Sequence, residues 1–303
     1  IKTLVWTDTM QTAVMFITLI LIITAVISHL DMSLPQAVSA ICSHPHSRIF
    51  VFDDWHTTQN FFKQFLSGIF VVIVMTGLDQ DMMQKSLTCP SLRDSQKNLC
   101  SYAFAFIPAN LLFLSLGILL MMLAAQTGTP LPAKGDDLLP MFAATGLLGQ
   151  TVVAFFAIGL IASAFSSADS ALTALVTSVC IDILRRPEDE RTRKAAHIII
   201  TAVFVVLTIL FSHIGSSSVI NAIYIMCSYT YGPLLGLFSF AIFTRRSTNE
   251  RFTPFICILS PIACYALDTL SQHLWNYHFG YELLMLNGLL TFCGLLATSR
   301  RKA

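Results

Sequence analysis

Charged residues are scarce in this sequence. Of its 303 residues only 12% are Asp, Glu, Lys or Arg, whereas 55% are hydrophobic, and the mean hydropathy is +0.70. Soluble domains carry about a quarter charged residues, so this composition excludes an ordinary soluble protein and predicts a membrane protein with several spans. The formal net charge is +1 and no basic block is present, so nothing indicates nucleic acid as a partner.

Several chemical motifs are missing as well. The eight cysteines include no CxxC or other paired spacing, which argues against a disulfide framework and against a zinc site. The sequence contains no HExxH motif, P-loop or Ser-His-Asp order, and four histidines lie at the ends of apolar runs: His197, His213, His273 and His278. The sequence therefore does not predict an enzyme.

Apolar runs of helix length predict eight transmembrane helices. They lie at about residues 9–28, 61–84, 99–126, 148–184, 195–212, 217–243, 252–270 and 280–298. The fold class expected is therefore an all-α membrane protein, with the lipid bilayer as its surroundings.

The distribution of basic residues predicts which connectors are cytoplasmic. With Lys2 placed inside, the cytoplasmic connectors are 85–98, 185–194, 244–251 and 299–303. Of the 18 Lys and Arg residues, only Arg48, Lys63 and Lys134 then lie on the outer side. This bias follows the positive-inside rule, so we expect both ends of the chain to be cytoplasmic, in the plasma membrane or the inner membrane of a bacterium.

The longest predicted outer loop, residues 29–60, gathers groups that can bind metals. These are Cys42, His44, His46, Asp53, Asp54 and His56. Their spacing matches no standard set of metal ligands, and a proline interrupts the HPH run. A solvated loop with a short helix is therefore the better interpretation.

A stripe of hydroxyl groups runs through the apolar segment 159–184. At helical spacing one face collects Ser163, Ser166, Ser167, Ser170, Thr173 and Thr177. Asp169 borders this stripe, roughly 24 Å of helix before the charged end at Arg185. A carboxylate at that depth is costly unless it is protonated, paired or bound to a cation. Small hydroxyl residues are also typical of a helix–helix seam, so the stripe indicates a seam or, together with Asp169, a cation site.

Three other segments carry polar groups within or beside apolar runs. Asp8 belongs to a WTD motif at the inner end of the first span, and Gly77 interrupts an apolar run just before DQDMMQK. The third segment is SYTYGP at Ser228–Pro233. Because proline lacks a backbone donor and disfavours a regular helix before it, this span is either broken, as at transporter binding sites, or simply kinked.

Taken in order, these segments resemble the sodium/solute symporter family, which carries sugars, proline, pantothenate and sialic acids with sodium. The opening LVWTDTMQTAVMF, with Gln11 after WTD, resembles the fifth core helix of that family. GLDQDMMQKSLTCPSLRDSQKN resembles the sixth core helix and the loop after it, with Gln84 and Lys85 as the Gln-plus-base pair. The 159–184 segment resembles the eighth helix and ends in Asp182, and the Gly232–Pro233 break with FTRRSTN resembles the tenth.

The resemblance implies a five-plus-five inverted-repeat fold of the leucine-transporter type. On that alignment residues 1–303 form a single transmembrane transporter domain, with core helices five to ten and two further helices. The chain begins at Ile1 and enters a helix almost at once. We therefore expect that the first four core helices belong to a missing N-terminal part of a longer protein.

The resemblance also implies two sodium sites. In the family, one sodium is held by carbonyls of the first core helix and by eighth-helix groups that correspond here to the Ser166 and Ser167 hydroxyls and the Ser163 carbonyl.

Some members hold a second sodium at positions that correspond to Asp8, Asp169 and Ser170. Asp169 departs from the serine of the family, and two facing carboxylates cannot both stay ionised cheaply without a cation. Either Na⁺ bridges them or one holds a proton, which leaves proton coupling as an alternative.

The substrate-binding positions of the family are only partly recognisable. Where sugar carriers have an Asn and a gating Tyr, this chain has Val72 and Met75, which argues against a sugar bound in the same way. The candidate substrate-contacting residues are Thr76, Tyr224, Ser228 and Tyr229.

The resemblance implies a sodium-coupled symporter that imports a small organic solute by alternating access. The alternatives are a solute sensor or receptor with the same fold but no net transport, and a proton-coupled carrier.

Overall fold

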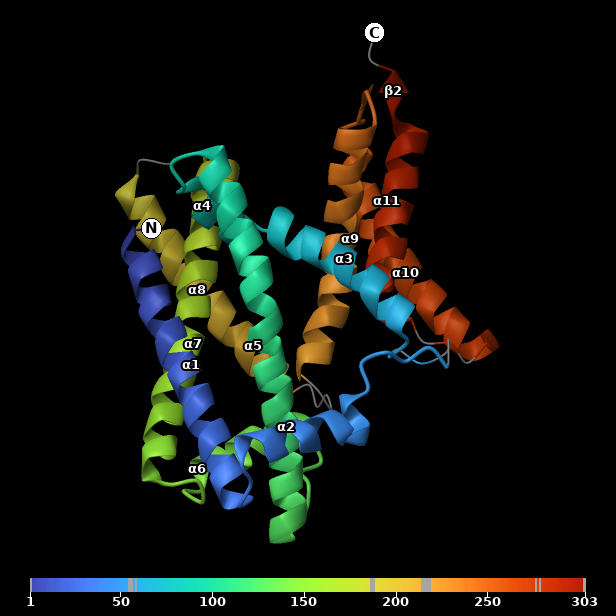
Figure 1. Cartoon of the computed structure of the whole chain (residues 1–303). Helices are drawn as coiled ribbons and strands as arrows, with labels where there is room; N and C mark the ends of the chain where they lie inside the picture. Colours follow the sequence, from blue (N-terminus) through green and yellow to red (C-terminus); the bar gives the residue numbers. More distant parts are fainter. Residues whose placement is uncertain are drawn as a thin grey trace. The chain divides into compact units, whose positions relative to one another are not determined.

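The computed structural model describes residues 2–53, 57, 59–185, 189–213, 219–275, 277 and 279–301. Within these residues the chain is helical apart from one antiparallel pair of short strands, β1 (Arg246–Ser247) and β2 (Arg300–Arg301) (Figure 1). The α-helices are α1 (Lys2–His29), α2 (Leu34–Ser43), α3 (Phe61–Gly77), α4 (Gln80–Leu87), α5 (Leu92–Thr127), α6 (Leu138–Ala144), α7 (Gln150–Ser178), α8 (Glu190–His213), α9 (Val219–Phe243), α10 (Thr253–Trp275) and α11 (Leu283–Thr298). The shorter turns are η1 (Pro45–Ser47), η2 (Gly135–Asp137) and the π-helical η3 (Val179–Ile183).

The predicted spans correspond to helices, but not all of these are long enough to cross a bilayer. Six described helices qualify by length and apolarity: α1, α5, α7 with η3, α8, α9 and α10. A seventh span results if α3 and α4 count as one span that is bent by 58°. α11 has 16 residues, roughly 24 Å of helix, which is less than a hydrocarbon core of about 30 Å. The described residues therefore include six or seven helices able to span a membrane, and the count of eight stays a prediction.

The break between α3 and α4 has a defined structure. α3 ends at Gly77, where the sequence predicted an interruption. Asp79 then begins α4, because its Oδ1 accepts hydrogen bonds from the backbone N–H groups of Asp81 (2.9 Å) and Met82 (3.3 Å). Its other carboxylate oxygen accepts a hydrogen bond from the Tyr231 hydroxyl of α9 at 3.2 Å. Asp79 thus both caps the start of α4 and bonds to α9 at the bend between α3 and α4.

The chain divides into two compact units, each with a core of its own. Unit 1 comprises Ile1–Ser47 and Met83–Ser218, and unit 2 comprises Arg48–Met82 and Val219–Ala303. The main core of unit 1 joins α1, α5, α6 and α7, and a smaller cluster joins α7 and η3 to α8. The core of unit 2 joins α3, α9 and α11.

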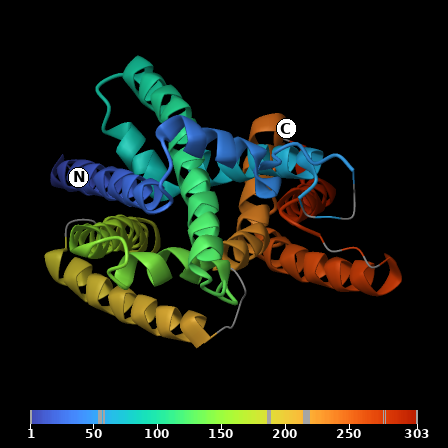
Figure 2. The ribbon, with the colours of Figure 1, turned by 60° about the horizontal axis from the view of Figure 1, so that its bottom comes forward.

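In unit 1, α7 lies between α1 and α8 (Figure 2). Thr18 of α1 packs on Gly159 of α7, where a Cβ atom would lie 2.9 Å from the threonine Oγ1. The same hydroxyl donates to the carbonyl of Phe155 at 3.0 Å. A glycine facing a hydroxyl side chain lets the two helices approach closely and hydrogen-bond across their contact. Part of the polar stripe on α7 is therefore a helix–helix seam.

In unit 2, α9 and α11 pack closely. A Cβ atom on Gly232 would lie 2.2 Å from Cγ of Asn287, and one on Gly236 would lie 2.5 Å from Cβ of Thr291. Both partner side chains are fully buried. Only glycine leaves room for these side chains, so the glycines of α9 admit the polar groups of α11.

The contacts of Asn287 show whether the span is broken or kinked at Gly232–Pro233. α9 is one continuous helix with Pro233 inside it, so this span is not broken. Proline at position 233 cannot donate to the carbonyl of Tyr229, four residues earlier. That carbonyl accepts a hydrogen bond from Nδ2 of Asn287 at 2.9 Å, and the Ser228 carbonyl accepts from the same atom at 3.1 Å. The carbonyl freed by the proline is therefore satisfied within the protein and does not line an open site.

This arrangement predicts coupling between Asn287 and Pro233. Asn287→Leu should lower thermal stability by about 1 kcal/mol because the Tyr229 carbonyl loses its donor. In a Pro233→Ala background the loss should be smaller, since alanine restores the backbone donor that proline lacks. Thermal unfolding of the four proteins in detergent measures this double-mutant cycle. Asn110→Leu is the matched control because, among the described residues, the Asn110 amide bonds only to Phe106 of its own helix. Equal losses in both backgrounds would contradict the assignment.

Candidate functional site

Asp8 joins three helices of unit 1. Its Oδ1 accepts a hydrogen bond from the Ser166 hydroxyl of α7 at 2.5 Å, and its Oδ2 lies 3.3 Å from Nζ of Lys85 on α4. The Asp8 and Lys85 side chains are 22% and 32% exposed, so solvent weakens their attraction only in part. The carboxylate that the sequence placed near the end of the first span is therefore both hydrogen-bonded and paired with a cation.

Two buried oxygen atoms near this contact have no hydrogen-bond partner among the described residues. They are Oε1 of Gln11 and Oγ of Ser170. Because Asp8 contacts Ser166 while Thr18 contacts Phe155, α1 and α7 run antiparallel. Gln11 therefore lies about one turn from Asp8 along α1 in one direction, and Ser170 lies about one turn from Ser166 in the other. A buried polar group without a partner is unusual in a folded protein, and here two such oxygens flank one carboxylate.

The predicted first sodium set, Ser163, Ser166 and Ser167, lies on the continuous helix α7. Ser166 is half-buried and bonded to Asp8, whereas Ser163 and Ser167 are exposed. Ser163 borders a mainly apolar cavity between α1, α5, α6 and α7 of about 270 Å³. The structure thus brings one member of this set to Asp8 and does not close a ligand shell around all three.

The predicted second set behaves differently. Ser170 lies about one turn after Ser166 on α7 and is 2% exposed. Asp169 is exposed and makes no hydrogen bond or ion pair with any described residue. A close approach of Asp8 and Asp169 stays a prediction, since two ionised carboxylates would form no hydrogen bond with each other. The partner of Asp8 is Ser166, which the sequence had placed in the other set.

The candidate substrate residues all belong to unit 2. Tyr224 contacts Tyr281, with ring centroids 5.1 Å apart, and Ser228 is buried and donates to the Tyr224 carbonyl at 2.9 Å. Tyr229 is half-buried, and its ring centroid lies 6.4 Å from that of Tyr265. Tyr224 and Ser228 share one face of α9, and that face contacts α11 and Tyr281, two residues before α11 begins.

Thr76 is half-buried on α3, and no direct bond joins it to the candidate residues of α9 among the residues that the structure describes.

Unit 2 also contains a charged cluster before α11. Nζ of Lys63 lies 3.6 Å from Oε1 of Glu282 and 4.1 Å from the ring centroid of Tyr277. The Tyr277 hydroxyl donates to the same Glu282 oxygen at 2.8 Å. Burial is the main cause, and this hydrogen bond a second cause, of a pKa of the Tyr277 phenol above its ordinary value. The cluster ties the start of α3 to the loop before α11.

The predicted outer loop contains helix α2 and the turn η1, which confirms the short helix expected there. The rings of His44 and His46 lie 5.4 Å apart, and Arg48 pairs with Asp53. Asp54 and His56 lie outside the described residues. Within the part of the chain that the structure describes, no three His, Cys, Asp or Glu side chains are placed to hold a metal.

Two side-chain contacts were not recognised from the sequence. Lys85 was noted only as part of a motif, because sequence spacing does not show that α4 reaches α1. Asn287 stands alone in the apolar run LLMLNGLLTF. An amide in such a run needs a partner in the membrane, and the carbonyl freed by Pro233 was the available acceptor.

Comparison with known proteins gives two findings. The family model described as "Sodium:solute symporter family" matches residues 1–251. The chain is also similar to the "Sodium/sialic acid symporter SiaT" of Proteus mirabilis (strain HI4320), with 27% identity over 210 residues. That match covers 64% of this chain and 41% of the relative, so the chain corresponds to less than half of the relative's length. No solved structure matches the chain.

The geometry at Asp8 predicts different roles for two adjacent serines. Ser166→Ala should lower thermal stability in sodium-free buffer by about 1 kcal/mol, because Asp8 loses a hydrogen bond from a hydroxyl group. Ser167→Ala should leave stability unchanged, because Ser167 is exposed and bonds to no described residue. Thermal unfolding of the two variants side by side makes the comparison. Equal effects would show that Ser166 does not hold Asp8 in place.

Proposed function

The chain belongs to the sodium:solute symporter family, whose members are transporters and not enzymes, and we propose that its protein imports a small organic solute together with sodium by alternating access. The observation that carries this proposal is the pair of buried oxygens, without partners among the described residues, on either side of the Asp8–Ser166 contact. A carboxylate with nearby hydroxyl and amide oxygens is a hard donor set, which suits an alkali cation and not a soft metal.

We place the cation where α1 and α7 meet, with Asp8 as its charged ligand. Ser166 and Ser170 would supply hydroxyl oxygens, and Gln11 a neutral carbonyl oxygen. Ser163 and Ser167 remain proposed ligands of the first sodium together with groups from elsewhere in the protein. Asp169 remains a proposed ligand or proton carrier of the second site. Carboxylate, hydroxyl and amide oxygens are hard donors of the kind that suits sodium.

The ammonium group of Lys85 would compete with sodium for the Asp8 carboxylate. Its ammonium group already neutralises Asp8 at 3.3 Å, so a sodium ion at the carboxylate would displace or weaken that ion pair. Because Lys85 lies on α4, just after the break at Asp79, sodium binding would change the restraint between α1 and α4. A ligand shifts a conformational equilibrium only through different interactions in the two states, and this exchange of cations provides such a difference.

The energetics of such coupling are sufficient. One sodium charge that crosses a membrane potential of 100 mV releases about 2.3 kcal/mol, before any concentration gradient is counted. This is comparable to the coupling free energies of about 1–3 kcal/mol that are typical between binding sites.

For the solute, we propose that unit 2 supplies part of the binding wall through Thr76, Tyr224, Ser228 and Tyr229. The aromatic rings of Tyr224 and Tyr229 are the better candidates for direct contact, because both residues are half-buried whereas Ser228 is buried. The name of the Proteus relative suggests sialic acids as the first solutes to test.

We further propose that the protein lies in the plasma or bacterial inner membrane, with the eight-span topology, cytoplasmic chain ends and inverted-repeat fold expected from the sequence. The bias of Lys and Arg toward one set of connectors supports the orientation.

Removal of an unpartnered oxygen provides a test of sodium binding. Ser170→Ala should leave stability without sodium unchanged or slightly higher, because it removes an unsatisfied buried hydroxyl. The same change should raise the sodium concentration for half-maximal stabilisation at least threefold, since a ligand is lost. Thermal unfolding in sodium against potassium chloride, at pH 6 and pH 8, measures both quantities.

Ser67→Ala is the matched control for this test. The Ser67 hydroxyl is also buried and without a described partner, but it lies on α3 in unit 2. Its removal should leave the response to sodium intact. A parent protein with no response to sodium at either pH would contradict sodium coupling and favour a proton-coupled carrier. Sodium binding without uptake in vesicles would favour a sensor.

Loss of the competing ammonium provides an independent prediction. Lys85→Gln should lower the sodium concentration for half-maximal stabilisation, because Asp8 then lacks its tethered cation. Lys85→Arg should keep the parent value or raise it. Lys97→Gln, an exposed site with the same charge change, controls for net charge. If Lys85→Gln and Lys97→Gln give equal sodium affinities, Lys85 does not compete at the site.

A further inference from the structure

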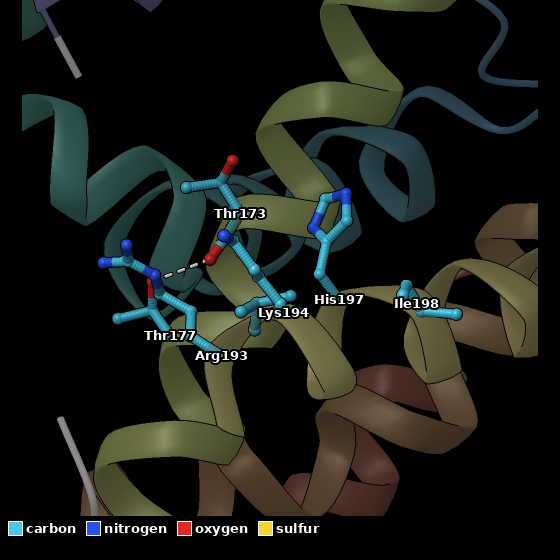
Figure 3. Close-up of a pocket in the computed structure, with 7 residues that line it drawn as sticks. Thr173, Thr177, Arg193, Lys194, His197 and Ile198 are labelled. Atoms are coloured by element: carbon cyan, nitrogen blue, oxygen red, sulfur yellow. Dashed lines mark hydrogen bonds between the residues drawn. The ribbon is translucent and has the colours of Figure 1, made fainter. Parts of the chain in front are cut away.

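A basic cavity opens between α7 and α8 in unit 1, away from Asp8. Its volume is about 520 Å³, and its lining includes Thr173 and Thr177 from α7 with Arg193, Lys194, His197 and Ile198 from α8. Figure 3 shows the threonines of α7 beside the basic side chains of α8. The sodium:solute symporter assignment gives no role to these residues.

Among the described basic side chains at the cavity, Arg193 is available to bind an anion. Lys194 pairs with Glu190 at 2.8 Å, and both side chains are exposed. Asp189 accepts hydrogen bonds from the Arg191 backbone and from the Thr192 hydroxyl. The guanidinium of Arg193 has no acidic partner among the described residues. A guanidinium offers a planar set of donors that matches two oxygens of a phosphate group.

Neutral donors lie next to this guanidinium. The Thr177 hydroxyl donates to the backbone carbonyl of Thr173 at 2.7 Å. The hydroxyl of Thr173 itself bonds to no described residue, so it is free to donate to a ligand. The His197 ring lies one helical turn after Arg193 and offers a further N–H donor. Together these groups favour an oxyanion over a neutral ligand.

The surface beyond the cavity is apolar and exposed. Only 6% of the apolar, membrane-spanning part of α8 is buried within the protein. The face of α8 that begins at Ile198 continues, at helical spacing, through Val205, Val206 and Ile209, whose side chains are all more than half exposed. A ligand with a phosphate group at the cavity and acyl chains along this face would satisfy both surfaces.

We propose that the α7–α8 cavity binds the phosphate of an anionic phospholipid headgroup. Arg193 provides the main charge, Thr173 and His197 provide further donors, and the acyl chains lie on the Ile198 face of α8. Basic pockets between membrane helices are typical sites for anionic headgroups. This inference does not depend on sodium coupling. Because α7 also carries Ser166 and Ser170, such a lipid would hold the end of the helix that lines the proposed cation site.

The test measures thermal stability of the purified protein in detergent during titration with phosphatidylglycerol. Phosphatidylcholine and soluble glycerol phosphate serve as separate probes. We expect a saturable rise with phosphatidylglycerol, at least fivefold tighter than with phosphatidylcholine. Arg193→Gln should weaken the response at least fivefold, and Thr173→Val should weaken it less. Arg191→Gln is the matched control, because this exposed arginine is on the same helix and does not line the cavity.

Three results would overturn the proposal. Equal responses to the two lipids would show that the headgroup charge is not recognised. An equal response to glycerol phosphate would indicate a soluble anion instead of a lipid. Equal weakening by Arg191→Gln and Arg193→Gln would indicate diffuse attraction to positive charge. Unfolding of each variant in phosphatidylcholine verifies that it is folded before the comparison, and Thr173→Val tests the cavity without any change of charge.

Discussion

The carboxylate of Asp8 is the group on which the proposed transport site depends. A charged oxygen within a membrane span must be compensated, and here Ser166 donates to one of its oxygens while Lys85 neutralises the other. These contacts connect α1, α7 and α4, the last of which follows the bent connection at Asp79. The close packing of Thr18 on Gly159 brings α1 and α7 near enough for the contact to form. Any cation that binds at Asp8 therefore acts on the connection between three helices.

The α9–α11 contact shows buried polar groups that do not belong to the proposed cation site. The carbonyl freed by Pro233 accepts from Asn287, and the amide oxygen of Asn287 accepts in turn from Ser260. Each of these polar atoms has a hydrogen-bond partner, and glycine at position 232 leaves room for the amide of Asn287. Around Asp8, by contrast, the oxygens of Gln11 and Ser170 are buried without partners among the described residues. This difference, and not the mere presence of polar residues, is why the cation site is placed at α1 and α7.

The sequence predicted the helical fold and the positions of its elements well, because apolar runs and glycine or proline interruptions are local signals. The end of α3 at Gly77 and the continuous hydroxyl stripe on α7 illustrate this. The pairing of side chains was harder, because it depends on which helix faces turn toward each other. The sequence did not predict that Ser166 donates to Asp8, because it had assigned these two residues to different sodium sets. It also left Pro233 undecided, because its answer lies 54 residues away, at Asn287.

The exchange of Lys85 for sodium at Asp8 can be measured directly. An amine-reactive reagent that enters the membrane would modify Lys85 at a rate set by how often its ammonium group leaves the carboxylate, with modified peptides quantified by mass spectrometry. The account predicts that sodium, but not potassium, raises the modification rate of Lys85 in a saturable way while the rate at Lys97 stays constant. A Lys85 rate that is unchanged or lowered by sodium would contradict the claim that sodium and Lys85 compete for Asp8.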